Sequence, residues 1–273
     1  MILDFLVVFT NSAFKSVYLW LPLFGLIIGL FGSMAGSGGG FFFPLILMVV
    51  FDVPPHIAVP TALAATLPVC LAGSVSHYHK KNIHFRLAFV FAAAGILGAM
   101  GGAVITSFLS DRQLSIAFSF YALILALVIF FKKPKKKLEH TQDVLQKQKL
   151  TVRKISLGAV FGFAGGMISG TFGTNGAGPV LAGLMVLKQP VKIAIGTSLF
   201  IVLINTFSAF TGHYLLGEVD FTLLGMLTAG SVAGAVAGPW VLKGFKPGKW
   251  EKQFRHAIAF IILFMSFNLF FEN

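Results

Sequence analysis

Two interruptions of an otherwise apolar sequence decide the fold: residues 33–44 read SMAGSGGGFFFP, and residues 169–179 read SGTFGTNGAGP. Both lie between hydrophobic segments. A chain in lipid cannot leave backbone amides unpaired, so irregular backbone persists there only where it is buried or lines a cavity. The two stretches therefore mark places where the chain departs from regular helix inside a membrane.

The composition places the whole chain in a membrane. Hydrophobic residues make up 56% of it, charged residues only 11%, and the mean hydropathy is +0.87. Several apolar windows of about 20 residues are long enough to cross a bilayer, among them Phe85–Leu109 and Phe221–Leu242. We therefore predict an all-α polytopic membrane protein that spans the lipid bilayer.

The net charge of +12 does not indicate a nucleic-acid partner, because basic residues in so apolar a chain are typical of cytoplasmic loops. The single cysteine, Cys70, lies in an apolar stretch and is expected to serve packing. One cysteine excludes an internal disulfide and a multi-cysteine metal site. His77, His79 and His84 do not converge at metal-ligand spacing, so we expect no metal and no cofactor.

An internal repeat divides the chain. A shift of 136 residues aligns Pro54–Gly102 with Pro190–Gly238 without a gap, and fourteen of the 49 positions are identical. The shared dipeptides His77-Tyr78 and His213-Tyr214 are rare in this composition. The sequence thus predicts three segments: residues 1–131 as a first membrane repeat, 132–154 as a basic linker and 155–273 as a second repeat.

Lysine and arginine set the predicted orientation. Residues 132–154 hold nine of them, which makes this linker the clearest cytoplasmic segment. When the membrane spans are counted outward from this linker, nineteen of the 21 basic residues fall in the cytoplasm. The N-terminus then lies outside, as do Lys15 and Arg112, the two remaining basic residues. Under this count the two repeats have opposite orientations in the membrane.

Each repeat is expected to contain a broken or re-entrant hairpin and three membrane-spanning helices. The second leg of each hairpin, Phe41–Phe51 or Ala177–Leu187, has only eleven residues, which as helix would span about 16 Å, roughly half of the bilayer core. Each interruption is therefore expected near the membrane midplane. The spanning helices are predicted at 57–77, 84–108, 113–131, 191–214, 220–243 and 253–271.

Half-helices that start at the midplane would direct unpaired N–H groups and a positive dipole end at one central point, which suits a small anion. Such paired interruptions in two repeats are typical of transport sites. Pro44 and Pro179 fit the first turn of these helices. The glycines could instead serve only close helix packing. The residues expected to bind the anion are Ser37, Gly38, Gly39, Gly40, Phe41, Thr174, Asn175, Gly176 and Ala177.

Further candidates lie on the spanning helices. Asn205 falls mid-helix, where an amide without a partner is costly, so we expect it at a site or gate. Thr61, Thr197 and Ser198 either join the site or bond to their own helices. His77, His213, Tyr78 and Tyr214 are candidates for gating or proton coupling, with interfacial hydrogen bonding as the alternative. No carboxylate lies mid-span, which leaves histidine as the titratable group.

These features together resemble the TauE/SafE family, the sulfite-exporter-like group also called the toluene sulfonate uptake permeases. The residues that carry the resemblance are Gly36–Pro44, Pro54–Leu63, Gly170–Pro179, Pro190–Leu199 and His213–Phe221. The resemblance extends from about Val17 over nearly the whole chain. This chain differs from the family in Pro60-Thr61-Ala62, where the family tends to have Thr-Ser, and in Asn175 and Ala177 within the second interruption.

The resemblance implies a secondary transporter that moves a small sulfur-containing organic anion, such as sulfite, sulfoacetate, taurine or another sulfonate. It implies the bacterial cytoplasmic membrane as the location and the proton gradient as the driving force. A passive anion channel, or a membrane enzyme or assembly factor without transport, stays open as an alternative. The sequence shows no nucleophile–base pair, so we expect no enzyme. A homodimer is an open option.

Overall fold

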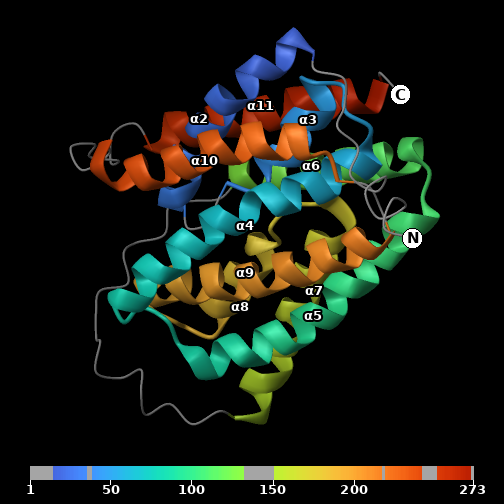
Figure 1. Cartoon of the computed structure of the whole chain (residues 1–273). Helices are drawn as coiled ribbons and strands as arrows, with labels where there is room; N and C mark the ends of the chain where they lie inside the picture. Colours follow the sequence, from blue (N-terminus) through green and yellow to red (C-terminus); the bar gives the residue numbers. More distant parts are fainter. Residues whose placement is uncertain (1–14, 36–38, 132–150, 217–218, 242–250, 272–273) are drawn as a thin grey trace, which may run out of the picture.

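The computed structural model describes residues 15–35, 39–131, 151–216, 219–241 and 251–271, and every regular element within them is a helix (Figure 1). A short 3-10 helix, η1 (Ser16–Trp20), precedes α2 (Leu21–Ala35). The remaining helices are α3 (Phe42–Val49), α4 (Pro55–His79), α5 (Phe85–Phe108), α6 (Asp111–Phe131), α7 (Val152–Phe172), α8 (Ala177–Val186), α9 (Val191–Leu216), α10 (Phe221–Val241) and α11 (Glu251–Phe271).

The helices match the sequence-based expectation closely, and the prediction of an all-α polytopic membrane protein is confirmed. The two short legs exist as α3 and α8, of eight and ten residues. Pro44 and Pro179 are each the third residue of their helix, where the missing N–H costs no hydrogen bond. Five helices in the described residues, α4, α5, α6, α7 and α9, are long and apolar enough to cross a membrane.

The two halves exchange a helix. The most extensive helix contacts are those between α5 and α7 and those between α10 and α2 (Figure 1). Helix α5 of the first half thus packs on the second half, and α10 of the second half packs on the first. Because each half supplies a helix to the other, the halves form one interlocked body.

Glycines allow α5 and α7 to approach until their backbones touch. A β-carbon on Gly166 would lie 1.9 Å from the carbonyl oxygen of Gly95, and one on Gly162 would lie 2.1 Å from that of Phe91. In the other direction, a β-carbon on Gly98 would lie 2.2 Å from the Phe163 oxygen. Small residues at such crossings are what helix packing in membranes requires.

The α2–α10 pair repeats these contacts position by position. Gly25 and Gly29 stand 137 residues before Gly162 and Gly166, and they face the carbonyl oxygens of Leu227 and Ser231. Those two residues stand 136 positions after Phe91 and Gly95. The two crossings therefore use the same backbone arrangement.

Corresponding helices α4 and α9 lie side by side and antiparallel. The backbone N–H of His84, just before α5, donates to Thr197 Oγ1 at 2.9 Å, and the N–H of Asp220, just before α10, donates to Thr61 Oγ1 at 3.4 Å. Asp220 and His84 stand at equivalent repeat positions, as do Thr61 and Thr197. Each threonine therefore ties the start of its helix to the helix junction of the other half.

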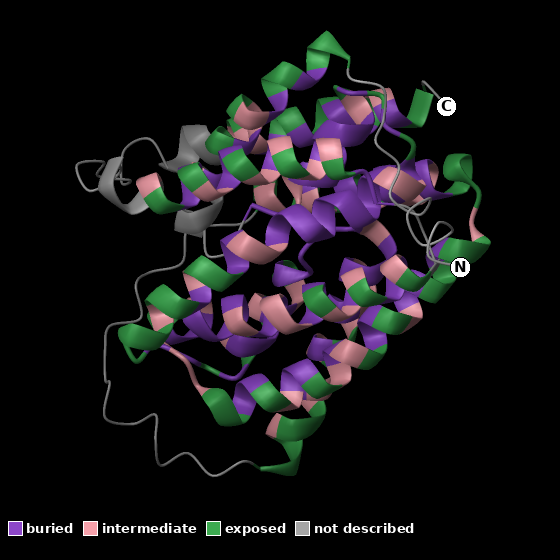
Figure 2. Ribbon diagram, viewed as in Figure 1, coloured by how far each residue is buried: buried purple, intermediate pink, exposed green. Residues whose placement is uncertain are grey.

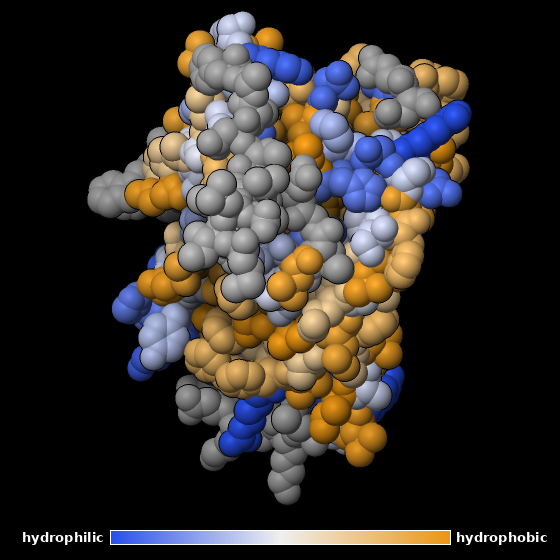
Figure 3. Space-filling view, turned by 45° about the vertical axis from the view of Figure 1, so that its right-hand side comes forward, coloured by the Kyte–Doolittle hydropathy of each residue, from blue (hydrophilic) through white to orange (hydrophobic). Residues whose placement is uncertain are grey.

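The outer surface suits a lipid environment. The middle of α4 is buried, whereas the outer helices keep an exposed side (Figure 2). Apolar side chains cover much of the face in Figure 3, and Phe108, Phe260 and Phe264 are among the exposed aromatic residues. The opposite membrane orientation of the halves, the midplane position of the interruptions and the division into three segments stay predictions. Most of the basic linker, residues 132–150, lies outside the described residues.

We expect Gly166→Ala to destabilise the protein, because the added methyl group would collide with the Gly95 carbonyl. Overpacking of this kind costs roughly 1–3 kcal/mol. Thermal unfolding followed by circular dichroism in detergent measures the loss. The matched control is Gly225→Ala in α10, where nothing lies within 4 Å of the added carbon. Equal melting temperatures for the two variants would contradict this packing.

His84 predicts a pH dependence of stability. Its Nδ1 accepts a hydrogen bond from the Leu87 N–H at 3.4 Å and so caps α5 in the neutral form. Burial lowers the pKa of His84 from its ordinary value of 6.5, and nearby Arg86 and Lys154 lower it further, against the opposing effect of its own backbone hydrogen bond. Since the folded state binds this proton more weakly than the unfolded state, the stabilisation is full above about pH 6.5 and is lost as the pH falls toward the lowered value.

The variant His84→Asn keeps an acceptor at the cap but cannot titrate. Between pH 7 and pH 5 its melting temperature should fall less than that of the wild type. His79→Asn, a change at an exposed histidine at the end of α4, serves as the control and should keep the wild-type slope. Identical slopes for all three proteins would show that His84 does not carry the effect.

Candidate functional site

The first interruption turns the chain from α2 into α3 and contacts both α4 and the second interruption. Gly39 has φ 70°, a conformation that favours glycine, and its carbonyl accepts from the Phe42 N–H at 3.0 Å. A β-carbon on Gly40 would lie 2.8 Å from Thr66 Oγ1 and 3.0 Å from the β-carbon of Asn175. The two interruptions therefore meet at Gly40. Ser37 and Gly38, two of the predicted site residues, lie outside the described residues.

The second interruption depends on two glycines with positive φ. Gly173, with φ 67°, ends α7 and packs on the carbonyl oxygen of Val59. Gly176, with φ 57°, precedes α8 and packs on the carbonyl oxygen of Gly165. Close backbone packing, the alternative considered for these glycines, thus accounts for both positions.

Protein side chains approach two carbonyl oxygens at the end of α7. His213 Nε2 lies 2.6 Å from the Gly170 oxygen, and Thr106 Oγ1 lies 3.1 Å from the Thr171 oxygen. Both oxygens belong to the last turn of α7, whose carbonyls have no partner within the helix. The opposite side of the break consists of the backbone amides at the start of α8.

Asn175 occupies that amide side. Its side chain is 4% exposed, and its Oδ1 accepts from the Ala177 N–H at 3.4 Å. One of the N–H groups expected to face an anion is thus already used by the protein. The Asn175 amide nitrogen, in contrast, is buried and has no hydrogen-bond partner among the described residues.

A polar face of α9 lies beside the second interruption. Asn205 and Ser198 are fully buried, and within the described part of the chain neither side chain has a partner. Their spacing of seven residues puts them two turns apart on one face. The position of a β-carbon on Gly165 would be 2.9 Å from the Gly176 oxygen and 3.8 Å from Asn205 Nδ2, so Asn205 adjoins the break.

A buried amide left unpaired costs roughly 1–3 kcal/mol, so a native protein that keeps one is expected to use it. Val202, on the same face of α9, packs with Cys70 of α4 and Ala177 of α8. The central region is therefore enclosed by α4, α8, α9 and the two interruptions.

Four aromatic rings pack next to this region. Phe41 of the first interruption stacks on Phe118 at 6.2 Å, and Phe172, before the second interruption, stacks on Tyr121 at 4.9 Å. Phe41 and Tyr121 also meet edge to face at 5.9 Å. The rings join both interruptions to α6.

The remaining predicted residues lie away from the contact between the interruptions, except that His213 contacts the Gly170 oxygen. Thr61 and Thr197 form the ties between the halves described above. His77 packs against Gly196 at the start of α9, and Tyr78 is 58% exposed beside Phe85. His213 and Tyr214 lie at the opposite end of α9, where Tyr214 packs on Phe210. The structure thus separates the two His-Tyr pairs, and their gating role stays a prediction.

Sequence reasoning missed Thr66 and Tyr121. Thr66 is fully buried, and its hydroxyl donates to the Ala62 carbonyl at 2.8 Å while facing Gly40. Both residues are hydroxyl-bearing residues in the middle of apolar helices, the same signal that singled out Asn205. It also missed His56 and Asp111, whose Nδ1 and Oδ1 atoms lie 2.6 Å apart although the residues stand 55 positions apart.

Comparison with known proteins places this architecture in a family. The family model of the sulfite exporter TauE/SafE matches residues 21–269. The probable membrane transporter protein YdhB of Bacillus subtilis is 28% identical over 221 residues, which cover 79% of this chain and 85% of that protein. A probable membrane transporter protein of Xylella fastidiosa strain 9a5c is 30% identical over 228 residues, which cover 82% of this chain and 84% of that protein.

No solved structure matches the chain. The family match covers all the helices from α2 to α11 and both interruptions. The chain therefore belongs to the sulfite exporter TauE/SafE family of membrane transporters.

Proposed function

We propose that this protein is a secondary transporter of a small sulfur-containing organic anion such as sulfite, sulfoacetate, taurine or another sulfonate. The anion binds where the two interruptions meet, and alternating access exposes that site to each side of the bacterial cytoplasmic membrane in turn. The observation that carries the proposal is the set of buried, unpaired amide groups of Asn175 and Asn205 beside the start of α8.

Neutral hydrogen-bond donors and a helix N-terminus, rather than a buried full charge, support an anion. Among the described residues the buried side chains include one carboxylate, Asp220, whose oxygen caps α10 by accepting from the N–H groups of Thr222 and Leu223. No lysine or arginine is buried there either. Neutral donors and a helix N-terminus attract an oxyanion without the tight binding of a full countercharge, which suits a site that must also release its ligand.

The broken helices support a transport cycle. Discontinuous helices whose N-termini face one site between two repeats are the arrangement of many secondary transporters. In this chain α3 and α8 begin at residues 42 and 177, next to the contact between Gly40 and Asn175. A rearrangement at this contact would change the surroundings of both helix starts.

Uptake into proteoliposomes tests the proposal. Purified protein is reconstituted, and accumulation of radiolabelled sulfite, sulfoacetate and taurine is followed with and without an inward proton gradient. Uphill accumulation of at least one of them is expected. Flux that only equilibrates would indicate a passive channel, and absence of flux with every one of them would refute the assignment.

The variant Asn205→Leu should increase the stability of the protein while it abolishes anion binding. Leucine has nearly the shape of asparagine, so the change removes an unpaired buried amide and should stabilise the protein by roughly 1–3 kcal/mol. At the same time, the increase in melting temperature that sulfite or a sulfonate produces in the wild type should disappear. Both effects are measured by thermal unfolding without anion and with each anion at concentrations that increase in 10-fold steps.

The control for this variant is Thr211→Val on the same helix. Thr211 is exposed, and its hydroxyl donates to the Phe207 carbonyl at 2.9 Å, away from the interruption. It should keep the ligand-induced shift. An Asn205→Leu protein that is less stable and still responds to the anion would show that Asn205 serves the fold rather than the site.

A further inference from the structure

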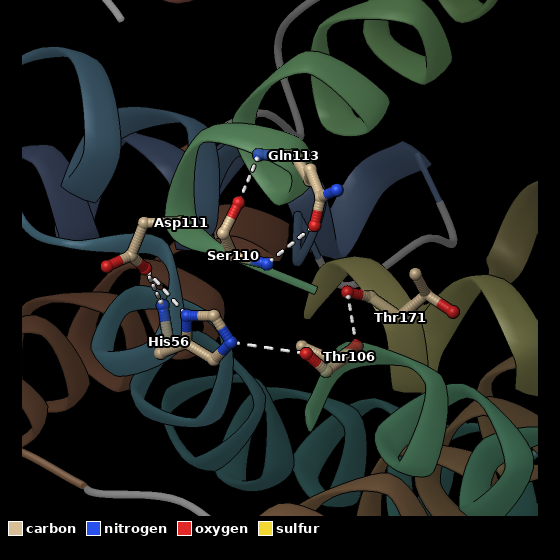
Figure 4. Close-up of polar contacts among 6 residues, drawn as sticks. All are labelled: His56, Thr106, Ser110, Asp111, Gln113 and Thr171. Atoms are coloured by element: carbon tan, nitrogen blue, oxygen red, sulfur yellow. Dashed lines mark hydrogen bonds and ion pairs between the residues drawn. The ribbon is translucent and has the colours of Figure 1, made fainter. Parts of the chain in front are cut away.

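His56, in the first turn of α4, joins three helices at one end of the molecule (Figure 4). Its Nδ1 lies 2.6 Å from the Oδ1 of Asp111, the first residue of α6. Its Nε2 lies 3.1 Å from the carbonyl oxygen of Thr106, in the last turn of α5. Ser110 and Gln113 exchange side-chain and backbone hydrogen bonds at 2.9 and 3.3 Å, which fixes the start of α6 and the place of Asp111.

Both partners of the imidazole ring accept hydrogen bonds. The Thr106 carbonyl can only accept, so Nε2 must carry a proton. A second proton then lies between Nδ1 and the Asp111 carboxylate, and it belongs to the pair rather than to either residue. If this second proton leaves, a lone pair on Nδ1 faces a carboxylate at 2.6 Å, and the contact becomes repulsive.

Hydrogen bonds connect this pair to the candidate anion site. The residue whose carbonyl His56 binds, Thr106, has its hydroxyl 2.9 Å from the Gly102 oxygen of its own helix, 3.1 Å from the Thr171 oxygen and 3.4 Å from the Gly170 oxygen, and its single proton is shared among them. The Gly170 oxygen is the one that His213 contacts at 2.6 Å. A change at His56 would thus reach the end of α7, where the second interruption begins, through Thr106.

Water can reach the pair. The side chains of His56 and Asp111 are 37% and 56% exposed. A cavity of about 270 Å³ adjoins Asp111, with Asp52 and Ser115 also in its lining. The other charged or titratable groups near the pair in the described residues are Asp52 in this cavity, the exposed Arg112 next in α6, and His213, which is close enough to interact electrostatically with His56.

We propose that His56 and Asp111 form a proton-binding site that closes this end of the transporter when the shared proton is bound and loosens it when the proton leaves. This end is the one that the distribution of basic residues puts outside the cell. The proposal rests on the proposed transport function and names the coupling residues of that site. The pair replaces His77 and His213 as the group that first receives the proton, since His213 is 4% exposed and the Nδ1 atom of His77 is buried.

Chemical labelling of the protein's own cysteine can report whether this end of the transporter is open. Cys70 is the single cysteine, is fully buried, and packs against Ala177 and Val202 in the central region. A membrane-impermeant methanethiosulfonate added to right-side-out vesicles can modify it only when the path from that face is open. The labelling rate is measured at pH 5.5 and pH 8.0 for the wild type, His56→Gln and Asp111→Asn.

Because the reactivity of a thiol itself changes with pH, the rate of each variant is divided by the wild-type rate at the same pH. An exposed ion pair is worth up to about 1 kcal/mol, so at pH 5.5 both variants should be labelled about two- to fivefold faster than the wild type. At pH 8.0, where fewer of the pairs hold the shared proton, the ratio should lie closer to one than at pH 5.5. His79→Gln, at the far end of α4, should give a ratio of one at both values.

Three results would overturn the proposal. The first is a ratio of variant to wild-type labelling rate that is the same at both pH values, which would mean a general loosening. The second is an effect of His79→Gln equal to that of His56→Gln, and the third is no labelling of any protein at either pH. Either variant alone carries the test if the other does not elute as a single species in gel filtration. The assay needs no substrate, so its success together with absent sulfite and sulfonate uptake would refute the substrate and leave the proton site standing.

Discussion

Direct contact between helix backbones is the constraint on which the rest of the structure depends. Gly166 and Gly95 bring α7 and α5 together so closely that no side chain fits between them, and Gly29 does the same for α2 against α10. In lipid, helices gain little from burying apolar surface, so close packing has to supply much of the association energy. Because each crossing joins one half to the other, the same contacts also hold the two interruptions face to face.

The second interruption shows how a break can persist in a membrane protein. Thr106 and His213 approach the carbonyl oxygens of Thr171 and Gly170, and its tight turns rest on the backbone of Val59 and Gly165. The side-chain amide nitrogen of Asn175 and the hydroxyls of Ser169 and Thr174 have no partner among the described residues. The contacts with Thr106 and His213 connect the shape of the break to α5 and α9.

The equivalent threonines Thr61 and Thr197 illustrate where sequence reasoning was informative and where it was not. The repeat identified both positions correctly as a pair, and their place at the start of long helices was predicted. Their partners, Asp220 and His84, were not, because each hydrogen bond spans more than a hundred residues and depends on how the halves pack. Thr66 and Tyr121 escaped notice for a related reason: a hydroxyl in an apolar helix becomes distinctive only when its neighbours in space are known.

The sequence by itself determined the membrane class, the helix positions and the two interruptions with their half-length second legs, because each of these follows from local composition and spacing. Its motifs also resembled the TauE/SafE family, which the family model confirms. Only the tertiary structure decided that the halves exchange a helix, that Gly40 meets Asn175, and that His56 meets Asp111 across 55 residues. These contacts depend on which helix faces approach one another. Close packing at the glycine crossings selects these faces, and the spacing of residues along the chain does not predict it.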